Sequence, residues 1–219
     1  MTAVFFDFDG TLVESYESAL LSYVELFREI GYDFDEGFLR ERFGRGSRKV
    51  IADFLEKHNI PHDEKRVDEL TERKGLLNLK HMGRIRLLPG VKRLLEELKD
   101  KNVCMAITTS NTLNFVRPLL KKGKIDKYFK AIVTREDFKE SKPSPDIYLK
   151  AAGLLNKKPE RCFVVEDSAA GIQAAKRAGM HPIAVASGQT PSGELEKERP
   201  ELLVGSLKDI EKIKNFLGV

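Results

Sequence analysis

The sequence predicts an α/β protein with a doubly wound, Rossmann-like parallel sheet core and an inserted all-helical cap domain. Three observations support this fold class. The apolar run VFF near the N-terminus stops at an acidic residue, as buried parallel strands do. Residues 15–83 show helical periodicity and contain no convincing strand. From residue 88 onward, short strand patterns alternate with helix patterns, which indicates βαβ units with right-handed crossovers.

Helical periodicity in the inserted segment falls into three stretches. Gly31 is expected to end the first helix, and Ser47 is expected to be the N-cap of the second. The third stretch is strongly charged and carries the adjacent basic residues Arg73 and Lys74, which we expect on a charged outer face. The predicted helices cover residues 16–30, 47–59 and 63–81.

The core pattern alternates helix and strand after the inserted segment. Pro118 interrupts one predicted helix, so a kink or an early end is expected there. The predicted helices cover residues 90–101, 112–122, 145–156, 169–178 and 206–217, and the predicted strands cover residues 103–109, 131–134, 162–166 and 182–186. We therefore expect residues 1–14 and 84–219 to form the core and residues 15–83 to form a helical cap.

Composition narrows the class of protein. The chain has 219 residues, 41% hydrophobic and 33% charged, which is typical of globular proteins and leaves room for one core with a small second domain. The net charge of +4 comes from interspersed acids and bases, so neither nucleic acid nor a membrane is an expected partner. The chain enters a strand directly, without a signal-peptide pattern, which favours a cytoplasmic location. We expect a monomer or small homo-oligomer, and the high charged fraction favours a thermophilic source.

Polar residues gather where the predicted strands end. In an open parallel sheet, ligands bind beyond the carboxyl ends of the strands, so these residues are expected to lie at one edge. Each of them alone has an ordinary explanation as a turn, capping or solvated residue. Their joint occurrence favours a functional site. The candidates are Asp7, Asp9, Thr109, Ser110, Asn111, Lys142, Glu166 and Asp167.

The four carboxylates of this set indicate a cation. Two carboxylates about 4 Å apart repel each other by about 4 kcal/mol at an effective dielectric constant of about 20. A cluster of four would therefore not stay ionised without a counter-charge. Carboxylate and water oxygens are the ligands that Mg²⁺ prefers, and no His or Cys is close in sequence to favour zinc or copper. We expect Asp7, Asp9, Glu166 and Asp167 to form a Mg²⁺ site.

Four segments together resemble a known family. DFDGTL, the threonine after the second core strand, the lysine of SKPSPDIY, and VVEDSAAGIQAAKRAGM are similar in order and spacing to the four motifs of the haloacid dehalogenase superfamily. They resemble in particular its phosphatases with a helical cap, in the branch of phosphoglycolate phosphatase and β-phosphoglucomutase. The resemblance covers the core; the cap is similar only in its position and helical character.

The resemblance implies a covalent mechanism on a phosphorylated metabolite. Asp7 would attack phosphorus and form an aspartyl phosphate. Asp9 would act as general acid and then as general base, and its main-chain carbonyl would bind Mg²⁺. Dehalogenases of the superfamily lack this second aspartate, so its presence favours phosphoryl transfer. Asp167 would bind Mg²⁺ directly, with Glu166 as a further ligand or as a supporting partner.

The same resemblance assigns the residues that bind substrate. Thr109 and Lys142 would hold the phosphoryl oxygens as catalytic residues, and Gly10, Ser110 and Asn111 would line the phosphate position.

In the cap, Arg45 and Arg48 belong to the segment FGRGSRK, which could bind a substrate phosphate or carboxylate at a helix N-terminus. A solvated helix start explains the same residues equally well.

Three functions remain open at this point. A phosphatase acting on small phosphomonoesters is the leading one. A phosphosugar mutase is the alternative, since it shares the first displacement. The resembling mutases carry a His on the first cap helix where this chain has Ala19, whereas the pair Arg73–Lys74 is similar to a basic pair of those mutases. A non-catalytic protein that binds a phosphorylated ligand would have to lack a motif residue, and all are present.

Overall fold

The structure is a computed structural model that describes residues 2–219. Two compact units are present. The first comprises residues 2–14 and Arg86–Val219, and the second comprises Ser15–Ile85. Within the described residues, no helix has both the length and the apolar character needed to span a membrane.

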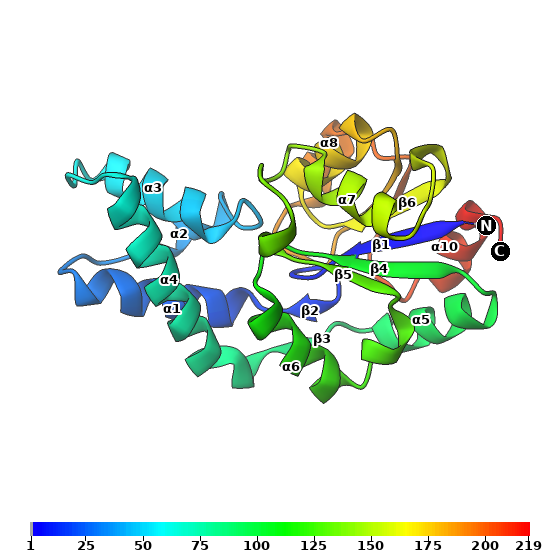
Figure 1. Ribbon diagram of the computed structural model, residues 1–219, viewed down its shortest axis with the longest axis horizontal. Helices are drawn as coiled ribbons and strands as arrows, with labels where there is room; N and C mark the ends of the chain where they lie inside the picture. The colour runs from blue at the N-terminus through cyan, green and yellow to red at the C-terminus, as the bar shows by residue number, and fades with distance from the viewer. Residues whose placement is uncertain (1) are drawn as a thin grey trace. The chain divides into compact units, whose positions relative to one another are not determined.

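A six-stranded parallel sheet forms the centre of the first unit (Figure 1). The chain begins in the middle of the sheet at β1 and builds one half outward through β4 and β5. It then returns to β6 on the other side of β1 and continues through β7 to β8. This doubly wound order, β5-β4-β1-β6-β7-β8, confirms the predicted fold class. The strands are β1 (Ala3–Asp7), β4 (Cys104–Thr108), β5 (Ala131–Val133), β6 (Cys162–Glu166), β7 (His181–Val185) and β8 (Leu202–Val204).

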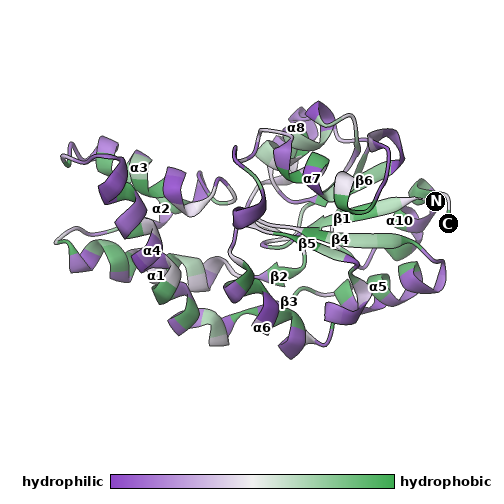
Figure 2. Ribbon diagram, in the orientation of Figure 1, coloured by the Kyte–Doolittle hydropathy of each residue, from purple (hydrophilic) through white to green (hydrophobic). Residues whose placement is uncertain are grey.

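Helices cover both faces of the sheet, α7 and α8 on one and α5 and α6 on the other (Figure 1). All five residues of β1 are buried, as a strand covered on both faces requires. The central strands are accordingly mostly hydrophobic up to their polar last residues, whereas the helices alternate between hydrophobic and hydrophilic residues (Figure 2). The helices of this unit are α5 (Val91–Asp100), α6 (Leu113–Gly123), α7 (Asp146–Leu154), α8 (Ala169–Arg177), α9 (Ser192–Lys197) and α10 (Ile210–Leu217).

One predicted helix boundary in this unit is wrong, and of the two outcomes expected at Pro118, a kink or an early end, the early end does not occur. Pro118 lies inside α6 and does not end it. The proline is exposed, while Val116 and Leu119 are buried, so packing of the apolar face maintains the helix. The last helix begins at Ile210 instead of residue 206, because the Asp209 carboxylate accepts hydrogen bonds from preceding main-chain amides and forms a turn. The short elements β8 and α9 were not predicted.

The second unit is entirely helical within its described residues, as predicted. Its core includes a cluster of aromatic rings, in which the Phe27 and Phe54 centroids are 3.8 Å apart and Phe34 packs against both. The helices are α1 (Tyr16–Glu29), α2 (Glu36–Arg40), α3 (Ser47–Lys57) and α4 (Glu64–His81), followed by the 3₁₀ turn η1 (Met82–Arg84).

Two expectations about this unit are also wrong. Ser47 is not the N-cap of α3 but its first helical residue. The N-cap is Gly46, which has φ of 86° and whose carbonyl accepts the first helical hydrogen bond, from the Val50 amide. Lys74 lies on an inner face, only 4% exposed, with its ammonium 4.6 Å from the centre of the Tyr23 ring. Contact of the ammonium with the Tyr23 ring and burial of the aliphatic part of the Lys74 side chain offset the hydration that the ammonium loses.

A short antiparallel pair lies where the chain leaves and re-enters the first unit. Strand β2 (Val13–Glu14) pairs with β3 (Arg86–Leu87). The pairing brings the two ends of the inserted segment together.

Candidate active site

Three buried carboxylates meet at the carboxyl end of the sheet. Asp7 is the last residue of β1, and Glu166 and Asp167 lie at the end of the neighbouring β6. The parallel register pairs Phe6 with Val165, which brings the two strand ends to the same level. One carboxylate oxygen from each residue lies within 4.8 Å of the others. This is the position where the strand order reverses, at which doubly wound proteins bind their ligands.

Lys142 supplies a positive charge to this cluster. Its ammonium contacts Asp7 Oδ1 at 2.5 Å and also contacts Glu166 Oε1. Burial by itself lowers the pKa of Lys142, but the carboxylates of Asp7 and Glu166 outweigh that effect and raise the pKa well above its usual value. Burial also raises the pKa of the Asp7 carboxyl well above its usual range, although the Lys142 charge opposes this. The lysine therefore stays charged beside Asp7.

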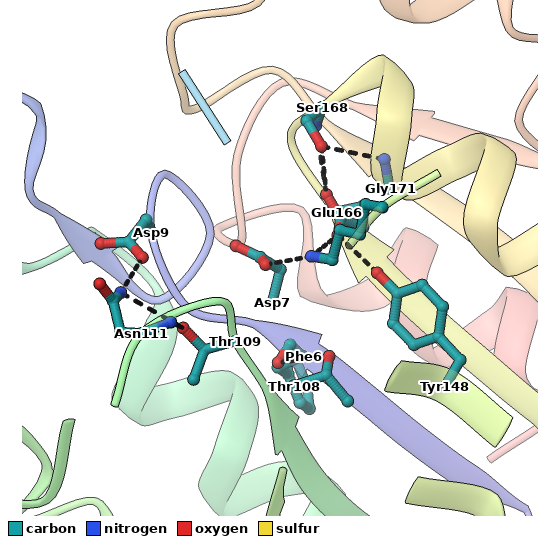
Figure 3. Close-up of polar contacts among 11 residues, drawn as sticks. Phe6, Asp7, Asp9, Thr108, Thr109, Asn111, Tyr148, Glu166, Ser168 and Gly171 are labelled. Carbon is teal, nitrogen blue, oxygen red and sulfur yellow. Dashed lines mark hydrogen bonds and ion pairs between the residues drawn. The ribbon is translucent and has the colours of Figure 1, made fainter. Parts of the chain in front are cut away.

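Glu166 is held on both of its oxygens by protein donors (Figure 3). The Tyr148 hydroxyl donates to Oε1 at 2.5 Å, and Lys142 donates to the same atom. The hydroxyl and main-chain amide of Ser168 donate to Oε2 at 2.9 and 3.3 Å. A side chain at Gly171 would overlap the Glu166 carboxylate, so the first turn of α8 approaches it closely. Of the two roles left open for Glu166, this arrangement favours the supporting one.

Asp167 differs from Glu166 in its partners. Within residues 2–219 no hydrogen bond or ion pair reaches its carboxylate, although the side chain is buried. Burial raises the pKa of Asp167 well above its usual range, and the nearby Asp7 and Glu166 raise it further. A buried carboxylate without a donor fits a position for a cation. The residues present thus fit Mg²⁺, with oxygen ligands only.

Asp9 lies apart from the three carboxylates and is held by the loop after β4 (Figure 3). The Asn111 side-chain amide donates to Asp9 Oδ2 at 2.5 Å. Thr109, which directly follows β4, accepts a bond from the Asn111 main-chain amide at 3.1 Å through its hydroxyl. The structure therefore links Asp9, Thr109 and Asn111. Ser110 lies in the same loop and is half-buried.

Gly10 allows the loop after β1 to pass close to Asp167. It has φ of 76°, and a Cβ there would lie 2.6 Å from Asp167 Cγ. Thr11 beside it is fully buried, and its hydroxyl has no partner among the described residues.

Arg45 and Arg48 belong to the second unit. Arg45 is exposed. The Arg48 guanidinium donates to Asp68 at 2.7 Å, and its hydrogen bond with Asp68 raises the pKa of Arg48. Their role in substrate binding stays a prediction.

Sequence reasoning missed Tyr148 and Ser168 as partners of Glu166. A signal for Tyr148 exists in SKPSPDIY, where the tyrosine follows Lys142 by six positions at the start of a helix. Ser168 directly follows the acidic pair and is the N-cap of α8, accepting a bond from the Gly171 amide at 3.1 Å.

Residues 4–185 match the family model of the haloacid dehalogenase-like hydrolases. The chain belongs to this family. It is 30% identical to a phosphorylated carbohydrates phosphatase of Thermotoga maritima, over 96% of this chain and 100% of that protein. It is 32% identical to a β-phosphoglucomutase of Bacillus subtilis, over 88% of this chain and 87% of that protein. The crystal structure of CbbY from Rhodobacter sphaeroides in complex with phosphate superposes with a TM-score of 0.85 at 30% identity, covering 96% of each chain.

The family and these relatives define the class of activity. The protein is an enzyme of the phosphatase and phosphomutase group of haloacid dehalogenase-like hydrolases. The predicted family and enzyme class are confirmed.

Proposed function

We propose that the protein is a Mg²⁺-dependent phosphatase that hydrolyses small phosphomonoesters through an aspartyl phosphate on Asp7. The observation that carries this proposal is the contact between the buried Asp7 carboxylate and the Lys142 ammonium, beside Glu166 and Asp167. A carboxylate at a strand end with a fixed cation beside it is suited to nucleophilic attack on a dianionic phosphate.

Asp7, Asp167 and the main-chain carbonyl of Asp9 are the proposed ligands of Mg²⁺. A bound Mg²⁺ supplies Lewis-acid stabilisation of negative charge on the phosphoryl oxygens. Glu166 is left out of this set because its oxygens already accept from Tyr148, Lys142 and Ser168. Its proposed task is to keep Lys142 in place when the phosphoryl group occupies Asp7.

The first displacement transfers the phosphoryl group to the enzyme. A carboxylate oxygen of Asp7 forms a bond to phosphorus while the bond from phosphorus to the ester oxygen breaks. The ester oxygen leaves with the electron pair and takes the proton of the Asp9 carboxyl group. An alcohol and the Asp7 acyl phosphate result. The Asn111 amide, which donates to Asp9 Oδ2, holds the acid in one orientation before substrate arrives.

The second displacement regenerates the enzyme. Asp9, now a carboxylate, accepts a proton from a water molecule as the water oxygen bonds to phosphorus. The bond between phosphorus and the Asp7 oxygen breaks, and inorganic phosphate leaves. Lys142 and Thr109 are proposed to bind the phosphoryl oxygens in both steps. The helical unit Ser15–Ile85 is proposed to act as a cap that selects the substrate, with Arg45 and Arg48 among its contacts.

Hydrolysis is favoured over mutase chemistry by the first helix of that unit. A mutase must keep water from its acyl phosphate until a sugar hydroxyl arrives. Ala19, at the position of the histidine in the mutases that this branch resembles, offers no polar group for such control. The pair Arg73–Lys74, which resembles a basic pair of those mutases, favours the other reaction, but Lys74 is buried against the Tyr23 ring and Arg73 forms an ion pair with Glu29.

A panel of phosphorylated metabolites tested with Mg²⁺, with released phosphate as the readout, examines the proposal. Wild-type protein should release phosphate, and Asp7→Asn should lower kcat by about 10³-fold or more because an amide is a poor nucleophile. The exposed Asp33→Asn variant is the matched control and should keep full activity. Substantial turnover by Asp7→Asn would refute the covalent mechanism. Conversion of β-glucose 1-phosphate to glucose 6-phosphate faster than phosphate release, with a bisphosphate primer, would show a mutase instead.

A further inference from the structure

The segment Ser187–Gly188, which no motif of the family resemblance includes, lies beside Asp167. It follows β7, whose register pairs Ala184 with Glu166, so the chain leaving β7 passes the end of β6. The amide of Ala186 donates to the Val204 carbonyl at 2.9 Å, which fixes the start of the segment against β8.

Gly188 approaches the Asp167 carboxylate more closely than any side chain would allow. A Cβ at this position would overlap Oδ2 and would lie 2.6 Å from Cγ and 2.9 Å from Cβ of Asp167. The φ angle of Gly188 lies outside the left-handed region, so its backbone conformation is open to other residues. Space beside Asp167, rather than backbone conformation, is what requires glycine here.

Gly10 approaches the same carboxylate from the loop after β1. A Cβ on Gly10 would likewise overlap Asp167 Oδ2 and lie 2.6 Å from Cγ. The two glycines therefore enclose one carboxylate between main-chain atoms. The Ser187 hydroxyl donates to the Gly10 carbonyl at 2.8 Å and joins the two enclosing segments directly.

We propose that Ser187 and Gly188 are positioning residues for metal binding, which hold the Asp167 carboxylate in the orientation that a divalent cation requires. The proposal rests on the proposed function, in that it takes Asp167 as a metal ligand. No described residue donates a hydrogen bond that could orient the Asp167 carboxylate. Close contact with the two glycines therefore restricts its rotation. A ligand that is already oriented loses less conformational freedom when the cation binds.

The first test measures Mg²⁺ affinity of Gly188→Ala without any substrate. The rise in unfolding temperature with Mg²⁺ concentration gives the dissociation constant, because a ligand that binds the folded state stabilises it. Since loss of groups that orient a metal ligand weakens binding about 10- to 100-fold, an increase of that size is expected. Gly193→Ala is the matched control, because a Cβ there meets nothing within 4 Å, and its affinity should not change. Equal affinity in Gly188→Ala and wild type would overturn the proposal.

A double-mutant cycle separates positioning of Asp167 from a general effect on the loop. Gly188→Ala should lower thermal stability in the wild-type background and less in the Asp167→Ala background, where the overlap with Oδ2 and Cγ is removed and only the 2.9 Å approach to Cβ remains. Equal losses in both backgrounds would overturn the proposal. Should Gly188→Ala not fold, Ser187→Ala replaces it, and an unchanged Mg²⁺ dissociation constant in that variant would be equally decisive.

These outcomes can be told apart from those that test the proposed function. Wild-type protein that hydrolyses phosphomonoesters with Mg²⁺, combined with unchanged Mg²⁺ affinity in Gly188→Ala, would remove only the positioning role. Weakened Mg²⁺ binding in Gly188→Ala, combined with full phosphatase activity in Asp7→Asn, would support the positioning role and remove only the covalent mechanism.

Discussion

Removal of the Tyr148 hydroxyl tests how Glu166 and Lys142 are held. Tyr148 is fully buried, and its hydroxyl donates to Glu166 Oε1 at 2.5 Å while its ring centre lies 5.5 Å from the Lys142 ammonium. Burial, followed by the Glu166 charge, raises the pKa of Tyr148 well above its usual value, so the phenol keeps its proton and donates. Tyr148→Phe deletes this donor and leaves the ring in place.

The size of the effect follows from the charge of the acceptor. A hydrogen bond to a charged group contributes about 1.5–3 kcal/mol. Glu166 Oε1 keeps its contact with Lys142, so the carboxylate is not left without a donor and no further desolvation penalty arises. For a chain of this length, about 1 kcal/mol corresponds to about 2–4 °C, so the unfolding temperature should fall by about 3–12 °C.

The assay is thermal unfolding followed by circular dichroism, with Tyr128→Phe as the matched control. The Tyr128 hydroxyl donates to Glu96 at 2.9 Å, and that glutamate is exposed and can be solvated by water. Removal of the Tyr128 hydroxyl should therefore change the free energy of unfolding by less than about 1 kcal/mol. Equal small losses in the two variants would refute the conclusion that the buried Tyr148–Glu166 bond secures the site. A fall in kcat of Tyr148→Phe, with intact folding, is expected as well because Lys142 loses part of its support.

Three further predictions concern the metal, the first residue of β7 and helix α6. Asp167→Ala should raise the Mg²⁺ concentration for half-maximal activity by about 10-fold or more, and EDTA should abolish wild-type activity; full activity in EDTA would contradict the metal assignment. Burial by itself lowers the pKa of His181, but its hydrogen bonds to Glu201 and the Glu160 carbonyl raise the pKa above the usual value. Protonated His181 therefore stabilises the fold below about pH 6.5, and this stabilisation is lost as the pH rises through the raised pKa. His181→Gln should lower the unfolding temperature more at about pH 6 than at about pH 8.5, with the exposed His62→Gln as control, and a pH-independent loss would contradict the ion pair. Pro118→Ala should raise the free energy of unfolding in urea by about 1–3 kcal/mol, because it restores a main-chain donor on the exposed side of α6. A lower free energy of unfolding would show instead that the proline ring is needed for packing.

The residues at the ends of the central strands could be predicted because their positions depend on local pattern. A buried strand such as β1 is apolar until it ends, and parallel strands share one edge at their carboxyl ends. Asp7 and Glu166 therefore come together in the structure as the pattern indicated. The same reasoning identified the helical segment, since its apolar residues recur at helical spacing.

Contacts between distant parts of the chain could not be predicted in this way. The hydrogen bond from Ser187 to Gly10 joins residues 177 positions apart. The sequence pattern around either residue does not indicate that the two are in contact. Tyr148 could be placed on a helix, but its contact with Glu166 depends on how α7 packs on the sheet. Lys74 was expected outside because lysine usually is, and packing against the Tyr23 ring reverses that preference.

Two features predicted from residue type alone, an N-cap at Ser47 and an early helix end at Pro118, are not found in the structure. Ser47 has the side chain of a typical N-cap, yet Gly46 before it adopts a positive φ angle and takes the position. Pro118 has the residue type that ends helices, but it lies on the exposed side of α6, where the packing of the buried side decides.

Detection of the phosphoryl group on Asp7 tests the covalent mechanism most directly. Wild-type protein would be mixed with Mg²⁺ and a phosphomonoester that the enzyme hydrolyses, and the reaction would be quenched in acid within one turnover. The quenched protein would then be digested for mass spectrometry. Borohydride reduction in a parallel sample converts an aspartyl phosphate to homoserine and so marks the modified residue. The mechanism predicts phosphate, and homoserine after reduction, at position 7 in the wild type and at no position in Asp7→Asn. Phosphate on a different residue, or turnover with no phosphorylated peptide at any quench time, would contradict it.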